Sequence, residues 1–375
     1  MKVGIVTYFT PDNYGAVLQA YALQTVVKRL GYDCEIVDYV CKARRKKHKL
    51  QIPRNPVNLL RNLKVAFEKK HRIPAKQAGF ADFRRRFLML SPHCNIVSDI
   101  DVGRYQALIA GSDQIWNPNI NEWDSAYWLA FANGKDVRKI AYAPSFGRAT
   151  LTTAQKRDYA EYLKDFYVVS CRESDGVELV RTELHYPDAS QTIDPTLLLE
   201  KSDYDICREE RKDKPPRYVL CFYVGSIDNG NPLVDLARRM AKIHDASLVF
   251  VSNEVYSRSF FPPHFINPTP GEALDLISSA QFVVTNSFHG MVFSIQFEKE
   301  FFVYTGSGRE NRVASLLDQC GIGERLIPQY STGDALPNVG SINYQSVTAA
   351  LQKPRGESLS FLRKALDGLE KTSRN

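Results

Sequence analysis

The chain has 375 residues, of which 44% are hydrophobic and 24% are charged. This composition is ordinary for a folded globular protein, and the length predicts two domains, each with its own core. No apolar run approaches the ~18 residues of a membrane-spanning helix, and the start MKVGIVTYFTPDNYG lacks the apolar centre of a signal peptide. We therefore expect a cytoplasmic protein.

The seven cysteines are scattered along the chain and form no CxxC pair. An odd, dispersed set favours a reducing compartment over a disulfide framework or a structural zinc site. We accordingly expect no metal and no tightly bound cofactor.

Basic residues gather in one segment. Residues 42–76 hold thirteen Lys or Arg and a single acid, Glu68, whereas the whole chain carries a net charge of +7. The run KARRKKHK leads into the amphipathic stretch PVNLLRNLKVAFEKKHR. Two interpretations stay open: a solvated surface arm, or a segment that lies on an anionic membrane at the inner face. Nucleic acid is disfavoured because no known binding motif accompanies the charge.

The chain begins with a βαβ pattern. Residues 3–8 form a β-branched run, apolar residues then recur at helical spacing from Ala16 to Leu30, and CEIVDYV follows as a second strand. Further strands are predicted at 107–110, 139–143 and 167–171. We expect an open, mostly parallel sheet in a first domain, residues 1–207, with a basic insertion at 42–80.

The pattern restarts after the charged, proline-ended stretch REERKDKPP at 208–216. YVLCFYVG, SLVFVS, FVVTN and FFVYTG are predicted strands, and PLVDLARRMAKIH and GEALDLISSA are predicted helices. This gives a second α/β domain over residues 216–350, which we expect to be the donor side, with the acceptor side on the first domain. A helix at 355–372 is expected to pack back on the first domain. Two Rossmann-like, doubly wound domains facing a cleft correspond to the GT-B-like architecture.

Ligands in such sheets lie beyond the carboxyl ends of the strands, which makes the residues after each strand candidates. After the first strand, Asn13, Tyr14 and Gly15 begin a helix, where free N–H groups favour an anion. Helix capping by Asn13 is an equally weighted alternative.

The loop GSDQIWNPN follows the strand at 107–110. It places a carboxylate, two amides and an indole close together, and an indole face suits a sugar ring. A helix cap with a buried tryptophan is the alternative. The candidates here are Gly111, Ser112, Asp113, Gln114, Trp116 and Asn117.

Arginines follow two other strands. Arg172 comes directly after YVVSC, and Arg309 and Arg312 follow FFVYTG. A guanidinium can hold a phosphate or carboxylate. For Arg172 a surface pair with Glu173 or an interdomain bridge is an open alternative, and for Arg309 and Arg312 the alternative is solvent exposure. Ser145, in the PSFG stretch after the strand at 139–143, is a further candidate ligand-binding residue at the same edge of the sheet.

The stretch TNSFHGMVFSIQF puts His289 in the first turn of a predicted helix. Asn286, Ser287 and Gly290 surround it, and the glycine permits close approach of another group. A lone histidine is usually structural, but its place at a strand end raises a functional role to even weight.

In order along the chain, NYGAVLQAYALQ, GSDQIWNP, IAYAPSFG, SCRE, IDPTLLL, NSFHGMVFSIQF and NRVASLL resemble the polysaccharide pyruvyl transferase family. The resemblance runs from residue 3 to about residue 370 and is weak over 42–80. It implies a GT-B-like enzyme that transfers the carboxyethylidene unit of phosphoenolpyruvate to a sugar, as a ketal. A lipid-diphosphate-linked saccharide, such as one on undecaprenyl diphosphate, is a candidate acceptor.

The same resemblance implies that His289 is catalytic or contacts phosphate, and that Arg172 and Arg312 bind the donor. Ketal formation needs an acid and a base, for which His289 and Asp113 are the candidates. A nucleotide-sugar glycosyltransferase and a non-catalytic glycan-binding protein of the same fold are the alternatives.

Overall fold

The computed structural model describes residues 2–10, 12–46, 74–147, 150–225, 231–252, 264–306 and 310–370. Residues 47–73, which include the amphipathic stretch of the basic segment, and Arg309 lie outside these ranges.

The first domain is built on a six-stranded parallel sheet in the order β2-β1-β3-β4-β5-β6. Its strands are β1 (Lys2–Val6), β2 (Cys34–Ile36), β3 (Tyr105–Ala110), β4 (Arg138–Ala141), β5 (Phe166–Cys171) and β6 (Ser190–Gln191). Its helices are α1 (Tyr14–Arg29), α2 (Lys42–Lys46), α4 (Pro118–Asn121), α5 (Thr153–Leu163) and α6 (Ser174–Thr182), and residues 74–87 are also helical. Short 3₁₀ turns lie at Val97–Asp99, Val102–Arg104, Ser125–Trp128, Ala130–Ala132, Pro195–Leu197 and Lys201–Tyr204.

The second domain carries another six-stranded parallel sheet, in the order β12-β11-β10-β7-β8-β9. Its strands are β7 (Tyr218–Tyr223), β8 (Ser247–Ser252), β9 (His264–Ile266), β10 (Phe282–Thr285), β11 (Phe301–Tyr304) and β12 (Leu326–Ile327). Its helices are α7 (Pro232–Ile243), α8 (Pro270–Ser279), α9 (Phe288–Gln296) and α10 (Glu310–Gln319), with a 3₁₀ turn at Gly323–Arg325.

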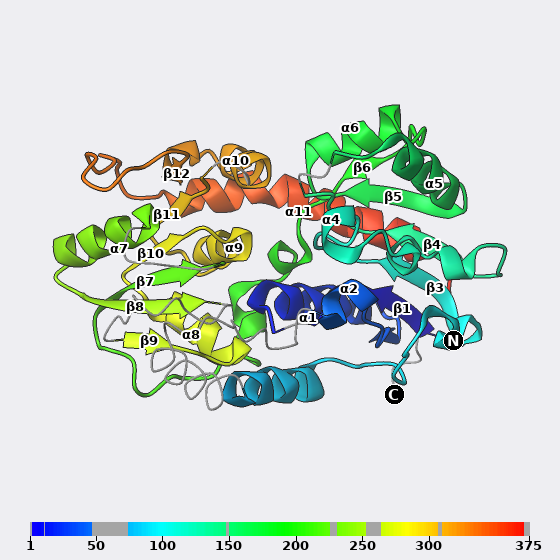
Figure 1. Ribbon diagram of the computed structural model, residues 1–375, viewed down its shortest axis with the longest axis horizontal. Helices are drawn as coiled ribbons and strands as arrows, with labels where there is room; N and C mark the ends of the chain where they lie inside the picture. Colours follow the sequence, from blue (N-terminus) through cyan, green and yellow to red (C-terminus); the bar gives the residue numbers. More distant parts are fainter. Residues whose placement is uncertain are drawn as a thin grey trace, which may run out of the picture.

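The prediction of two doubly wound α/β domains is confirmed, and Figure 1 shows the two sheets side by side with α1 and α9 between them. Parallel sheets need both faces covered, which explains why β7 and β10 are buried along their whole length. The strands β6, β9 and β12 were not predicted. They span only two or three residues, too few to produce a periodic pattern.

A single hydrophobic core crosses the domain boundary. It joins Val17 and Leu23 of α1 to Leu276 of α8 and Met291 of α9, all of them buried. The helical residues 74–87 reinforce this contact, since Arg84 pairs with Asp12 at 3.1 Å and a methyl group on Gly79 would touch Thr269. The two domains therefore share one packed interface.

The last helix, α11 (Tyr344–Leu366), runs from the second domain across to the first (Figure 1). It starts earlier than the predicted helix at 355–372, because Pro354 lies inside the helix instead of at its start. Its far end docks on the first domain: Tyr32 donates to the Leu366 carbonyl at 2.7 Å, and Ser358 Oγ accepts from Ile193 N at 3.0 Å. Among the helices of the described ranges, none has the length and apolar character required to span a membrane.

Candidate active site at the domain boundary

Each sheet reverses its strand order at one point. The reversal lies between β1 and β3 in the first sheet and between β7 and β10 in the second. Ligands of doubly wound sheets bind in the crevice at such points, beyond the carboxyl ends of the strands. The turns that follow β1, β3 and β10 therefore lie where a ligand is expected.

The turn after β10 is fixed by a hydroxyl. Thr285 Oγ1 donates to the Phe222 carbonyl at 2.6 Å and accepts from Ser287 N at 2.9 Å. A side chain at position 290 would bring its first carbon within 2.4 Å of that oxygen, so Gly290 is required by packing. Ser287 Oγ caps α9 by accepting from Gly290 N at 3.2 Å.

Asn286 fixes the same turn from the other side. Its side chain accepts from Val224 N at 2.8 Å and donates to the Val224 carbonyl at 2.9 Å, which ties β10 to the end of β7. Together these contacts hold His289 in the first turn of α9. Asn286, Ser287 and Gly290 thus position the histidine.

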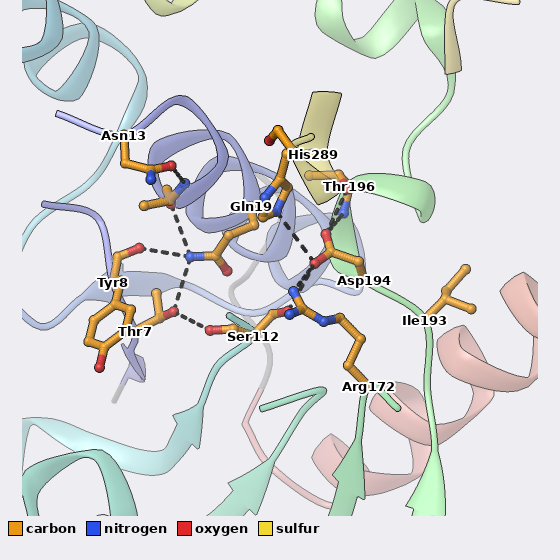
Figure 2. Close-up of polar contacts among 12 residues, drawn as sticks. Thr7, Tyr8, Asn13, Gln19, Ser112, Arg172, Ile193, Asp194, Thr196 and His289 are labelled. Atoms are coloured by element: carbon orange, nitrogen blue, oxygen red, sulfur yellow. Dashed lines mark hydrogen bonds and ion pairs between the residues drawn. The ribbon is translucent and has the colours of Figure 1, made fainter. Parts of the chain in front are cut away.

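His289 crosses the boundary to meet the first domain (Figure 2). A first side-chain carbon added to Gly15, at the start of α1, would lie 2.1 Å from His289 Nδ1. His289 Nε2 lies 3.6 Å from Asp194 Oδ2, and the histidine side chain is 11% exposed. Two helix N-termini, those of α1 and α9, therefore meet at one imidazole.

Asp194 is the centre of the cluster. Its side chain is fully buried, and its Oδ2 accepts from Arg172 Nη1 at 2.8 Å and from Ser112 Oγ at 3.2 Å. Its Oδ1 accepts from Thr196 N at 3.1 Å and from Thr196 Oγ1 at 2.6 Å. Figure 2 shows this carboxylate between Arg172 and His289.

Arg172 is buried and pairs with Glu173 as well as with Asp194. Its Nε donates to Glu173 Oε1 at 2.8 Å, and its guanidinium lies 4.6 Å from the centre of the Phe288 ring. Arg312 approaches the same ring at 5.8 Å. Arg172, Glu173, Asp194, Phe288 and Arg312 all line one pocket, and His289 meets this cluster at Asp194. Two arginines therefore flank one aromatic ring beside the pocket.

The local charges keep both Asp194 and Arg172 ionised. Burial opposes a charged carboxylate at Asp194, but His289, Arg172 and the hydrogen bond from Thr196 outweigh it and hold the Asp194 pKa well below its usual range. Burial likewise opposes a charged guanidinium at Arg172, yet Glu173, Asp194 and Asp113 raise the Arg172 pKa above its usual value. The cluster is a compensated ion network inside the protein.

A chain of hydrogen bonds links this network to the first sheet. Gln19 of α1 donates to Thr7 Oγ1 at 3.1 Å, and Thr7 Oγ1 donates to the Ser112 carbonyl at 2.8 Å. The Ser112 hydroxyl then reaches Asp194. Ser112 was predicted to face a ligand and is instead fully buried as a support for Asp194.

Asp113 is half-buried and stands in the left-handed region, with φ of 74°. A non-glycine residue there is strained, and such strain gathers at functional turns. Asp113 forms an isolated bridge with Pro144, whose carbonyl accepts from Arg172 N at 3.2 Å. The structure therefore brings Asp113 to the same cluster.

The rest of the GSDQIWNP loop packs against PSFG. Asn117 Nδ2 donates to Gln114 Oε1 at 3.0 Å, and both side chains press on Gly147, where a methyl group would come within 2.2 Å of Gln114. Asn117 also caps α4, and Ser145 Oγ accepts from Gly147 N at 3.0 Å. Gln114, Asn117 and Ser145 therefore stabilise the conformation of this loop.

The prediction that Trp116 presents a face to a sugar is wrong. Its exposure is 0%, and its ring stacks on Trp128 at 4.1 Å with an angle of 4° between the planes. Its indole N–H donates to the Tyr127 carbonyl at 3.1 Å. The alternative, a buried tryptophan, is the observed one, because the loop folds inward over the first domain's core.

The candidate residues Asn13, Tyr14 and Gly111 make structural contacts. Asn13 Oδ1 caps the helix through Ala16 N at 3.2 Å, and Tyr14, 2% exposed, donates to the Pro268 carbonyl of the second domain at 3.0 Å. Gly111 has Thr7, Leu23 and Ile5 packed about it. Gly15, the second residue of α1, packs directly against His289.

Sequence reasoning missed Asp194, and it considered Glu173 only as the partner of Arg172 in a surface pair, whereas the observed pair is buried. Asp194 stands in IDPTLLL, just before a proline, and an acid before proline is an ordinary turn signal that does not reveal partners far along the chain. No group of three or more His, Cys, Asp or Glu with the arrangement of a metal site occurs in the described part of the chain.

The model of the family described as polysaccharide pyruvyl transferase matches residues 13–308. The chain belongs to this family. The match covers the turn after β3, Arg172, Asp194 and His289, whereas Arg312 lies beyond its end.

Solved structures with a similar chain path include a putative UDP-N-acetylglucosamine 2-epimerase from Listeria monocytogenes, with 10% identity, a TM-score of 0.48 and coverage of 97% of this chain and 90% of that one. The UDP-GlcNAc 2-epimerase from Neisseria meningitidis, bound to UDP-GlcNAc, has 11% identity, a TM-score of 0.46 and coverage of 98% and 99%. The glycosyltransferase SnogD from Streptomyces nogalater has 11% identity, a TM-score of 0.41 and coverage of 98% and 96%. No curated protein matches the sequence of this pyruvyl transferase family member.

Proposed function

We propose that this protein transfers the carboxyethylidene unit of phosphoenolpyruvate to two hydroxyls of one sugar in a bacterial surface or capsular glycan precursor. One observation carries the proposal. Arg172 Nη2 and His289 Nε2 are buried nitrogen atoms with no hydrogen-bond partner among the described residues, and both side chains contact Asp194. Buried polar atoms of this kind call for a partner, which a bound anion supplies.

Phosphoenolpyruvate suits these groups by charge. It carries a carboxylate and a phosphate, roughly three negative charges, and planar guanidinium groups bind both oxyanions well. Arg172 and Arg312 beside Phe288 supply two such groups. The N-termini of α1 and α9 add backbone amide groups and the positive ends of two helix dipoles.

The reaction balances as follows. A proton adds to the methylene carbon of phosphoenolpyruvate, and the first sugar hydroxyl attacks the neighbouring carbon and loses its proton. Phosphate then leaves, the second hydroxyl attacks the same carbon, and its proton departs. The products are a cyclic ketal with a new methyl group and inorganic phosphate.

In this scheme His289 delivers the proton to carbon or donates to the departing phosphate, and Asp113 accepts a proton from the sugar or binds it. General acid–base catalysis of this type contributes about 10²–10⁴-fold to a rate. His289 is at the boundary of the two domains, while Asp113 lies in the first domain near Arg172. The proposal thus places the acceptor on the first domain and the donor between the domains.

The test is mass spectrometry of candidate lipid-linked saccharides after incubation with phosphoenolpyruvate, together with phosphate release. We expect the carboxyethylidene mass in the product, and a loss of at least about 10²-fold in His289→Ala and Asp113→Asn. His93→Ala is the matched control, since His93 also pairs with an aspartate, Asp38, at 3.0 Å but is 57% exposed. Near-normal rates in the two site variants contradict these roles.

The same incubation separates the alternatives. Sugar transfer from a nucleotide sugar, without consumption of phosphoenolpyruvate, identifies a glycosyltransferase instead. Absence of any donor binding by calorimetry favours a glycan-binding protein. An acceptor on undecaprenyl diphosphate would bring the reaction to the inner face of the membrane.

A further inference from the structure

We propose that Asp194 is a positioning residue that holds Arg172 and His289 toward one common point, and that it thereby makes the active arrangement depend on contact between the two domains. This inference rests on the proposed function for the roles of Arg172 and His289. It assigns to Asp194 a task distinct from theirs.

The hydrogen bonds of Asp194 occupy both of its carboxylate oxygens. Oδ1 accepts from Thr196, Oδ2 accepts from Ser112 and Arg172, and the side chain borders the pocket but is 0% exposed. A carboxylate engaged in this way is a weak base toward a sugar hydroxyl. Its effect must pass through the side chains that it touches.

Those side chains come from both domains. Arg172 directly follows β5 of the first domain, whereas His289 belongs to α9 of the second. Asp194 contacts both through the same oxygen, Oδ2, at 2.8 Å and 3.6 Å. One atom therefore sets the distance between the two groups that are proposed to hold the donor.

The carboxylate itself is held firmly within the first domain. Thr196 fixes Oδ1, and the Ser112 hydroxyl fixes Oδ2 as the end of the hydrogen-bond chain from Gln19 and Thr7. Figure 2 shows this chain leading from α1 to Asp194. Because Asp194 cannot follow His289, any opening of the domains separates the two.

The longer of the two contacts has a direct consequence. A distance of 3.6 Å between His289 Nε2 and Asp194 Oδ2 is an ion-pair distance just beyond an ordinary hydrogen bond. At this distance the carboxylate attracts the imidazole and limits its position, while His289 Nε2 makes no hydrogen bond to it and stays available to the donor.

The variant Asp194→Asn removes the charge and keeps the shape. Asp275→Asn is the matched control: Asp275 is also buried, at 6% exposure, and it accepts from Arg211 N at 2.9 Å and pairs with Lys214, away from the boundary cluster. Thermal unfolding establishes that both variants fold. If Asp194→Asn does not, Thr196→Val takes its place, since it keeps the carboxylate and removes one of the donors to Oδ1.

Nitrogen NMR of the histidine side chains reads out position without any substrate. The chain has seven histidines, and a His289→Gln sample assigns the signal of interest. We expect the tautomer or hydrogen-bond signature of His289 to change in Asp194→Asn, and to change less in Thr196→Val, while Asp275→Asn leaves it unaltered. An unchanged His289 signal in Asp194→Asn overturns the inference whether or not the wild type makes ketal.

Kinetics supply the second readout. We expect kcat at saturating phosphoenolpyruvate to fall by at least about 10²-fold in Asp194→Asn and about tenfold in Thr196→Val, because a misplaced catalytic group costs rate even when substrate is bound. Asp275→Asn should keep wild-type kcat. A wild-type kcat in Asp194→Asn overturns the inference, whereas absence of ketal in the wild type counts against the proposed function alone.

Discussion

Gly15→Ala is the sharpest test of the contact between the domains. The added methyl group would lie 2.1 Å from His289 Nδ1, 2.5 Å from Cγ and 2.7 Å from Cε1, whereas ordinary contacts begin at about 3.4 Å. The imidazole must therefore move by roughly 1 Å or more, and a misplacement of that size costs about 10² in rate. We expect ketal formation to fall at least about 10²-fold.

Stability should respond differently from activity. Gly15 lies in the first turn of α1, and alanine favours a helix over glycine by up to about 1 kcal/mol, which offsets part of the lost packing. Gly356→Ala is the matched control, because Gly356 lies inside α11 and has nothing within 4 Å of an added methyl group. It should gain about 1 kcal/mol with activity unchanged.

The assay pairs phosphate release with the free energy of unfolding in urea for both glycine variants. Activity of Gly15→Ala within threefold of wild type, in a protein of normal stability, would refute the contact between Gly15 and His289. An equal loss of activity in both variants would refute its specificity.

Three further outcomes are expected. Trp116→Ala should lower the free energy of unfolding by about 3–5 kcal/mol, because Trp116 is a buried aromatic residue. The KM for the acceptor should stay unchanged in the folded protein. A raised acceptor KM with normal stability would indicate that Trp116 binds the sugar after all. Burial lowers the pKa of Lys139 from its usual 10.5 to about 8, so the folded state binds fewer protons than the unfolded state between those values and stability rises with pH there. Lys139→Met should therefore be more stable than wild type by a constant amount below pH 8, and by a shrinking amount up to pH 10.5, in urea titrations; a pH-independent difference contradicts this. Liposome co-sedimentation at low salt decides between the two interpretations of residues 42–76: binding to anionic vesicles supports a segment that lies on the membrane, and absence of binding leaves a solvated arm.

The sequence by itself determined the fold class and the place of His289. Parallel strands are buried on both faces and appear as short apolar runs, and helices between them repeat at their own period, so VGIVTY, ALIA and FVVTN were recognisable. The strand end before His289, its capping serine and Gly290 are local features, and local features are what a sequence displays. The ordered motifs also gave the family, which the match over residues 13–308 shows.

Tertiary structure decided which polar residues meet. Asp194 and His289 are far apart in the chain, and nothing in IDPTLLL marks the aspartate as the partner of a histidine in another domain. Trp116 shows the converse, since a loop rich in polar residues turned its tryptophan inward onto Trp128. Periodicity and capping depend on neighbours within a few residues, whereas burial and ion pairing depend on how two separately formed sheets pack together.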